Sequence, residues 1–145
     1  MNGLSINARQ TSHGFEILFR GSKYVLNYPD EIWQAYPQEA KDVLFDNLVY
    51  AETVHLPLTF RRNEIKYNTS PPFFQTQFFQ NMVMDLPSCA DVDGTSTSEL
   101  LKEFMNLKTR FKDNEVKLPR YRHETRGDSS VVSLSFGKDS LLTWA

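Results

Sequence analysis

Residues 131–145, VVSLSFGKDSLLTWA, constrain the fold of this chain more than any other stretch. They open with a β-branched and aliphatic run, VVSL, which has the length of a buried strand. Small and polar residues around Gly137 follow, and from Leu141 an apolar pattern resumes that is typical of the first turns of a helix. The stretch therefore predicts a strand, a tight loop and a helix start. Such a loop directs backbone N–H groups and the positive end of a helix dipole toward one point, where an anion such as phosphate binds.

Two families of nucleotide-binding loop combine glycine, lysine and a hydroxyl residue, and their spacing separates them. The Walker A loop requires a glycine, four residues, and then Gly-Lys-Ser or Gly-Lys-Thr. Here Gly137 and Lys138 supply the pair, but Asp139 stands where the hydroxyl is needed. Val132 stands where the first glycine is needed. The sequence therefore excludes a Walker A loop.

The loop instead resembles the Ser-Gly-Gly-x-Asp-Ser loop of the PP-loop ATP pyrophosphatases, the adenine nucleotide α-hydrolase superfamily. The positions that match this pattern are Ser135, Gly137, Asp139 and Ser140, with Lys138 at the variable place. Phe136 replaces the first glycine, which leaves less room for phosphate against the backbone at that point. The alternative interpretation is a turn that only joins a strand to a helix.

The resemblance implies ATP as a ligand, Mg²⁺ as its companion, and cleavage of ATP between the α- and β-phosphates. Such an enzyme adenylates a substrate and releases pyrophosphate. The resemblance also implies the ATP-binding residues, which are Ser135, Gly137, Lys138, Asp139 and Ser140. Backbone N–H groups and the serine hydroxyls would hold the pyrophosphate portion, Lys138 would offset its charge, and Asp139 would orient the loop or meet the magnesium ion. The sequence indicates neither a catalytic residue nor the second substrate.

In the resembled family this loop follows the first strand of a Rossmann-like sheet, which further βα units complete. Those units are not among the 145 residues, so we expect an N-terminal part of a PP-loop protein without pyrophosphatase activity of its own. The predicted fold has an α+β N-terminal region, a hairpin plus several helices, over residues 1–118. A connector over 119–130 leads to the truncated start of an α/β nucleotide domain over 131–145. The alternative function is a non-catalytic binding or assembly module.

Composition and charge narrow the classes of function. Hydrophobic residues make up 40% of the chain and charged residues 23%, which is typical of a folded domain. The net charge of -2 gives no reason to expect a nucleic-acid partner on bulk electrostatics. The single cysteine, Cys89, excludes an internal disulfide and favours a reducing compartment. Because no apolar run has the length of a signal peptide or a membrane span, we expect a cytoplasmic protein.

Local patterns predict one hairpin and one long helix in the first half of the chain. Alternating apolar residues indicate a hairpin over 15–28 that turns at residues 20–22. A short helical turn is expected over 30–36. Pro37 then begins a helix whose apolar face is formed by Ala40, Val43, Leu44, Leu48 and Ala51. Pro57 suggests an edge strand or loop over 55–60, where His55 has no sequence neighbour that would make it a ligand.

The second half shows two further helices around a loop. Phe74, Phe78, Met82 and Leu86 recur every four residues, which predicts a helix whose apolar face is either core or a partner groove. In the loop predicted over 87–98, the aspartates do not meet the spacing of a calcium loop, so no metal site is predicted. Ser96 and Glu99 form a capping box that begins a helix running through Phe111.

Two kinds of surface, one apolar and one basic, could contact partners. The apolar helix face and the strand at 131–134 would leave apolar surface uncovered, so we expect a homo-oligomer. Two basic clusters could hold an anion, although a solvated loop and a solvated linker are the alternatives. Their members are Arg61, Arg62 and Lys66 in the first, where a strand is a further alternative, and Arg120, Arg122, His123 and Arg126 in the second, whose anion would be a phosphate or an RNA end.

Overall fold

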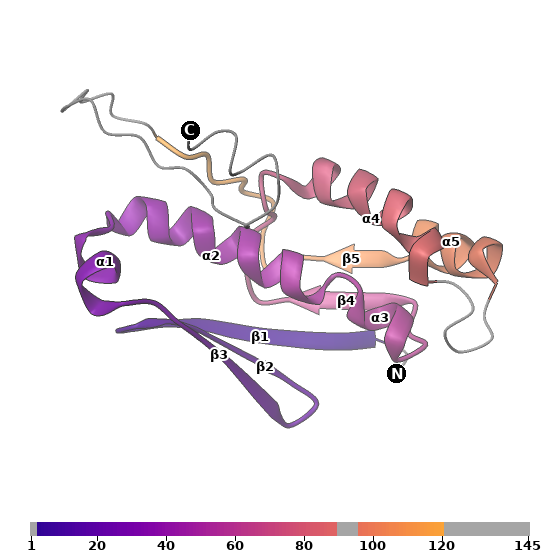
Figure 1. Cartoon of the computed structure of the whole chain (residues 1–145), viewed down its shortest axis with the longest axis horizontal. Coiled ribbons are helices and arrows are strands. Elements are labelled where there is room, and N and C mark those ends of the chain that lie inside the picture. Colours follow the sequence, from indigo (N-terminus) through magenta and orange to yellow (C-terminus); the bar gives the residue numbers. More distant parts are fainter. Residues whose placement is uncertain (1–2, 90–95, 121–145) are drawn as a thin grey trace, which may run out of the picture.

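A computed structural model of the chain describes residues 3–89 and 96–120. Within these ranges five strands form one mixed sheet in the order β3-β2-β1-β4-β5 (Figure 1). The strands are β1 (Gly3–Thr11), β2 (Gly14–Phe19), β3 (Ser22–Asn27), β4 (Glu64–Tyr67) and β5 (Lys108–Arg110). The first three strands pair antiparallel, whereas β4 runs parallel to β1 and β5 runs parallel to β4. The fold is therefore α/β with a partly parallel sheet.

The parallel pairs require crossover connections, and helices supply them. The helices are α1 (Asp30–Ala35), α2 (Gln38–Thr53), α3 (Leu56–Thr59), α4 (Gln75–Cys89) and α5 (Thr97–Met105). Figure 1 shows α2 and α4 lying on the same side of the strands. None of the helices in the described ranges is long and apolar enough to span a membrane.

Alternation along the strands shows which face of the sheet packs against the helices. On β1, Leu4, Ile6 and Ala8 are buried while the residues between them are exposed. The same parity buries Ile65 and Tyr67 on β4. Since successive strand residues point to opposite faces, one face of the sheet carries the core and the other meets solvent. The core is completed by helix residues, which include Val49, Tyr50, Val54, Leu86, Leu100 and Phe104.

Two positive-φ residues make the turn of the predicted hairpin. Arg20 has a φ of 49° and Gly21 a φ of 82°, and Phe19 pairs with Ser22 across them. A two-residue turn of this kind matches the twist of antiparallel strands. The predicted hairpin is thereby confirmed as β2 and β3. A second glycine, Gly14, is required by close packing, because a Cβ there would lie 2.0 Å from the Leu26 carbonyl oxygen.

Other local predictions are also confirmed. The short helical turn is α1, the helix after Pro37 is α2, and the four-residue spacing belongs to α4. At the start of α5 the Ser96 hydroxyl accepts a hydrogen bond from the Glu99 N–H, and the Glu99 carboxylate accepts one from the Ser96 N–H. The capping box is therefore present in both directions.

Three local predictions of secondary structure are wrong. Residues 56–59 form the short helix α3, not an extended segment, because Pro57 occupies its first turn, where a missing N–H costs nothing. The helix after the capping box ends at Met105, and residues 108–110 leave it to pair with β4. Helix α4 continues two residues beyond Pro87, since the bond that a proline loses there falls in the last turn.

Candidate functional site

The residues of the predicted phosphate loop lie outside the described ranges. They are Ser135, Gly137, Lys138, Asp139 and Ser140, with Phe136 among them. The aspartates of the loop at 91–93 and three members of the second basic cluster, Arg122, His123 and Arg126, lie outside as well. The site that the structure does describe is the approach to that loop, residues 111–120, and the part of α2 on which this segment lies.

The segment after β5 is fixed to the sheet at its beginning. The ring of Phe111 stacks on Tyr67 with 5.2 Å between centroids, and the Lys112 N–H donates to the Thr69 carbonyl at 3.0 Å. One residue later the Asp113 carboxylate accepts a hydrogen bond of 3.2 Å from the Ser70 hydroxyl. These contacts hold the chain beside the segment that leads out of β4.

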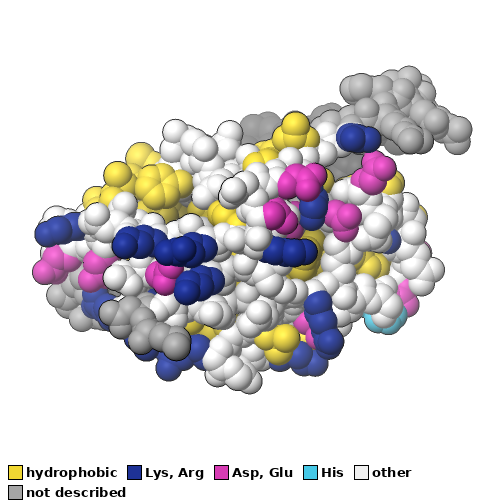
Figure 2. All heavy atoms as spheres, turned by 180° about the vertical axis from the view of Figure 1, so that it is seen from behind, with side chains coloured by type: hydrophobic (Ala, Val, Ile, Leu, Met, Phe, Trp, Pro, Cys, Tyr) yellow, Lys and Arg dark blue, Asp and Glu magenta, His cyan; other side chains and the backbone are white. Residues whose placement is uncertain are grey.

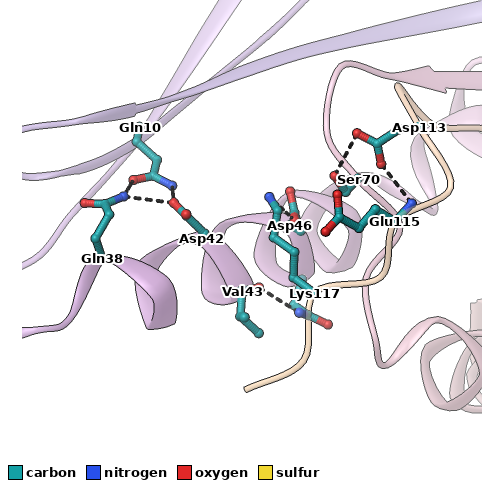
Figure 3. A network of polar contacts seen from close by, with 10 residues as sticks. Gln10, Gln38, Asp42, Val43, Asp46, Ser70, Asp113, Glu115 and Lys117 are labelled. Carbon is teal, nitrogen blue, oxygen red and sulfur yellow. Dashed lines mark hydrogen bonds and ion pairs between the residues drawn. The ribbon is translucent and has the colours of Figure 1, made fainter. Parts of the chain in front are cut away.

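A buried ion pair fixes the same segment to α2. Lys117 Nζ lies 2.8 Å from Asp46 Oδ2, and Figure 3 shows the lysine reaching across to the helix. The Asp46 side chain is 3% exposed and that of Lys117 is 36% exposed. The carboxylate is thus almost fully removed from water, while the ammonium group keeps part of its solvent.

The two partners respond differently to this environment. Burial raises the pKa of Asp46, and the hydrogen bond and charge of Lys117 offset that effect only in part. For Lys117 burial alone would lower the pKa, but the hydrogen bond and charge of Asp46 raise it overall, helped by Asp42 and Asp113. The ion pair therefore favours the charged form of Lys117, whereas burial still disfavours the charged form of Asp46.

A second polar cluster lies one turn earlier on α2. Asp42 Oδ1 accepts hydrogen bonds of 2.7 Å from the Gln10 amide and 2.8 Å from the Gln38 amide (Figure 3). The Gln38 amide also donates to the Gln10 side-chain oxygen at 2.8 Å. Since Gln10 belongs to β1 and the other two to α2, these bonds join the helix to the end of the central strand.

Between α2 and the segment lies a groove of about 620 Å³. Its lining comes from Glu39, Asp42 and Val43 on one side and from residues 115–120 on the other. Carboxylates outnumber the basic groups in it, so it does not suit a phosphate. No group of three or more metal-ligating side chains occurs in the described part of the chain. The arrangement anchors a segment and contains no nucleophile beside a base.

Buried tyrosines elsewhere in the core serve packing. Burial raises the pKa of Tyr50 to about 12, and it raises the pKa of Tyr67 further above its usual range. The Thr53 hydroxyl lies 3.1 Å from the Tyr67 hydroxyl. Both phenols stay neutral at ordinary pH, and neither opens onto a cluster of charged groups. His55, which the sequence left without a partner, is exposed.

Sequence reasoning missed both members of the ion pair. The apolar face that the sequence predicted for this helix does not include Asp46, but the buried face runs through Val43, Asp46, Val49, Tyr50 and Thr53. These residues recur at three- and four-residue intervals, as those of the predicted face do. The spacing alone was therefore compatible with either face being buried. Nothing local marks Lys117, because its partner is 71 residues away.

Comparison of the chain with protein-family models, with curated proteins and with solved structures found no match.

Proposed function

We propose that this protein binds ATP through the loop at residues 135–140 and that it serves adenylation of a substrate with release of pyrophosphate. The observation that carries the proposal is the order of residue types after the apolar run at 131–134. A hydroxyl, a glycine, a cation, a carboxylate and a second hydroxyl follow one another in the spacing of the PP-loop. Each of these residue types can bind a triphosphate or its metal ion. A turn that only joins a strand to a helix requires none of them except the glycine.

The chemistry follows from those types. Backbone N–H groups around Gly137, with the Ser135 and Ser140 hydroxyls, donate to the β- and γ-phosphate oxygens. Lys138 offsets their charge. Asp139 is a hard-oxygen ligand of the kind that Mg²⁺ takes singly alongside phosphates. An oxygen of the second substrate attacks the α-phosphorus, the bond from the α-phosphorus to the bridging oxygen breaks, and pyrophosphate leaves with that electron pair.

The described fold supports a division of the chain into an N-terminal region, a connector and a nucleotide-binding part. In this proposal residues 1–118 form an N-terminal region, residues 119–130 connect, and residues 131–145 begin a Rossmann-like nucleotide domain. The contacts of Phe111, Asp113 and Lys117 support it, because they fix the chain three residues before Arg120, where the described range ends. Because the start of the connector is anchored, the loop that follows it can reach a smaller volume than it could if the connector were unanchored.

Calorimetric titration of the protein with ATP and Mg²⁺ tests the proposal. A side chain at residue 137 would collide with the phosphate, so Gly137→Val is expected to abolish the heat of binding. Ser140→Ala is expected to weaken binding by about 1.5–3 kcal/mol, the contribution of one hydrogen bond to a charged group. Gly127→Val introduces the same side chain outside the loop and serves as the control.

Phe136 makes the test more specific to the loop. If its ring narrows the phosphate site, Phe136→Gly restores the family pattern and tightens ATP binding. Equal affinity of the wild-type protein and Gly137→Val contradicts the proposal, as does equal weakening by Gly127→Val. Unfolding curves for all four variants separate lost binding from lost structure.

A further inference from the structure

Charge is distributed unevenly over this fold. We call the side of the sheet away from the helices the open face. Its charged side chains are Arg9, Lys23, Lys66, Lys108 and Arg110, with Glu16 and Glu64. Five basic groups against two acidic ones make this face positive although the whole chain has a net charge of -2. The view from behind in Figure 2 shows Lys and Arg side chains gathered across the middle of the molecule, with acidic ones among them.

The acidic groups of the open face lie beneath the basic ones. Arg9 donates to Glu16 at 2.7 Å and Arg110 donates to Glu64 at 2.6 Å. Both arginine side chains are 69% exposed, whereas Glu16 is 12% and Glu64 20% exposed. Hydrogen bonds from these arginines hold the pKa of both carboxyl groups below the usual range. A molecule that approaches the open face therefore meets guanidinium and ammonium groups first.

A hollow of about 360 Å³ lies at one end of the open face. Its lining includes small residues of β1, among them Gly3 and Ser5, together with Arg20 and Arg62. The Arg20 guanidinium carbon sits 4.5 Å from the centre of the Phe60 ring, which holds the side chain in place. Within residues 3–89 and 96–120, no carboxylate pairs with Arg20 or Arg62. Guanidinium groups without a carboxylate partner suit phosphate oxygens.

The basic groups extend across the sheet beyond the hollow. Ser5 on β1 is level with Lys66 on β4, and Lys66 is level with Arg110 on β5. On the other side, Leu18 on β2 is level with Lys23 on β3. From β3 to β5 there are four strand spacings, or about 19 Å at 4.8 Å each. One phosphate group cannot contact basic groups that are spread so widely, but a chain of phosphates can.

We propose that the open face binds the sugar-phosphate backbone of a single-stranded nucleic acid, with one phosphate seated in the hollow between Arg20 and Arg62. No aromatic residue faces outward on the described strands of this face, so binding rests on phosphate contacts and not on stacked bases. It is therefore expected to show little dependence on base sequence. A membrane surface fits less well, since Leu18 and Val25 are the only large apolar side chains exposed on the described part of the face. The residues of this site are not those of the proposed ATP loop.

Fluorescence anisotropy with labelled homopolymeric RNA and DNA strands tests the inference. The test variant is Arg20→Asn with Arg62→Gln: asparagine tolerates the positive φ of residue 20, so the hairpin turn is kept while both charges are removed. The control is Lys41→Gln with Lys102→Gln, which removes two charges from α2 and α5 in the helical layer. Both variants have the same net charge.

We expect wild-type protein to bind both strands, with affinity falling between about 50 and about 200 mM salt. Each phosphate neutralised on a single strand adds about 0.7 to the slope of log affinity against log salt, so the test variant, which loses the one phosphate contact in the hollow, should lose about 0.7 of that slope. It should also bind at least about tenfold more weakly in about 50 mM salt, while the control binds like wild type. Gly137→Val, which abolishes ATP binding under the function proposed above, should leave strand binding unchanged.

Several results would overturn the inference. One is the absence of strand binding in the lowest salt, and another is equal binding by the test and control variants. Binding of vesicles that contain phosphatidylserine through Arg20 and Arg62, without binding of the strands, would assign the face to a membrane. Full competition by millimolar inorganic phosphate would assign the hollow to a small anion.

Discussion

Removal of Lys117 tests the anchor between α2 and the segment that leads to the predicted loop. Lys117→Met keeps the length and the apolar stem of the side chain but leaves Asp46, which is 3% exposed, without its cation. Breaking a buried ion pair by deleting one partner costs about 3–5 kcal/mol. The lysine end of this pair is partly solvated, so we expect about 3 kcal/mol. Asp46→Asn should cost less, about 1–2 kcal/mol, because the freed ammonium group can turn toward water and the amide oxygen still accepts a hydrogen bond.

The cost of Lys117→Met should depend on pH. Without the lysine, burial raises the pKa of Asp46 further above the unfolded value, which is 3.8. A carboxyl whose folded pKa is raised destabilises the fold as pH rises past the unfolded value and regains stability when it is protonated. Urea unfolding at neutral pH and near pH 4.5 should therefore show a smaller cost at the lower pH. Equal costs for the two variants, or a cost of Lys117→Met that does not change with pH, would refute this account of the anchor. Lys112→Met, at an exposed lysine nearby, should change stability by less than about 0.5 kcal/mol.

Three further predictions concern the sheet and its core. Because a hydrogen bond from β5 lowers the pKa of Glu64, its contribution to stability is present above the unfolded value of 4.5 and is lost as pH falls through the folded value; Glu64→Gln should thus lose less stability than wild type between pH 5 and pH 3 in urea unfolding. Gly14→Ala should lower stability by about 3 kcal/mol or more, since its Cβ would meet a carbonyl oxygen, whereas Gly21→Ala, with a positive φ but open space, should cost about 1 kcal/mol in the same thermal melts. Phe104→Ala should cost about 3–5 kcal/mol, and its exposed neighbour Met105→Ala less than about 0.5 kcal/mol; similar melting temperatures for these two variants would show that the core is assigned wrongly.

The elements that sequence predicted correctly are those whose signals are local. The hairpin needs its alternating residues and a two-residue turn, and α5 begins at a capping box only four residues long. Such features are decided by neighbours along the chain, so a pattern suffices to find them.

One strand that the sequence missed, β5, depends on a distant partner. β5 has three residues, two of them charged, and it becomes a strand only because it lies parallel to β4. No alternation can be recognised in so short a run. β1 is different: Leu4, Ile6 and Ala8 alternate with polar residues, so the central strand of the sheet could have been predicted from its period of two.

The buried ion pair and the positive face of the sheet could not be predicted from the sequence for a related reason. Asp46 is ordinary in sequence, and only the packing of Lys117 against it explains why a carboxylate is buried there. A net charge of -2 likewise says nothing about how charges are sorted between two faces of a sheet. Register and strand order decide that sorting, and both are properties of the folded chain.

Phosphorus NMR of ATP tests the central claim, which is that residues 135–140 hold the pyrophosphate portion of the nucleotide. In the presence of Mg²⁺, addition of the protein should shift or broaden the β- and γ-phosphate resonances more than the α resonance, because the loop donates to those two groups. Gly137→Val should restore the spectrum of free ATP, and Gly127→Val should behave like wild type. A spectrum unchanged by the wild-type protein, or changed equally by Gly137→Val, would contradict the account.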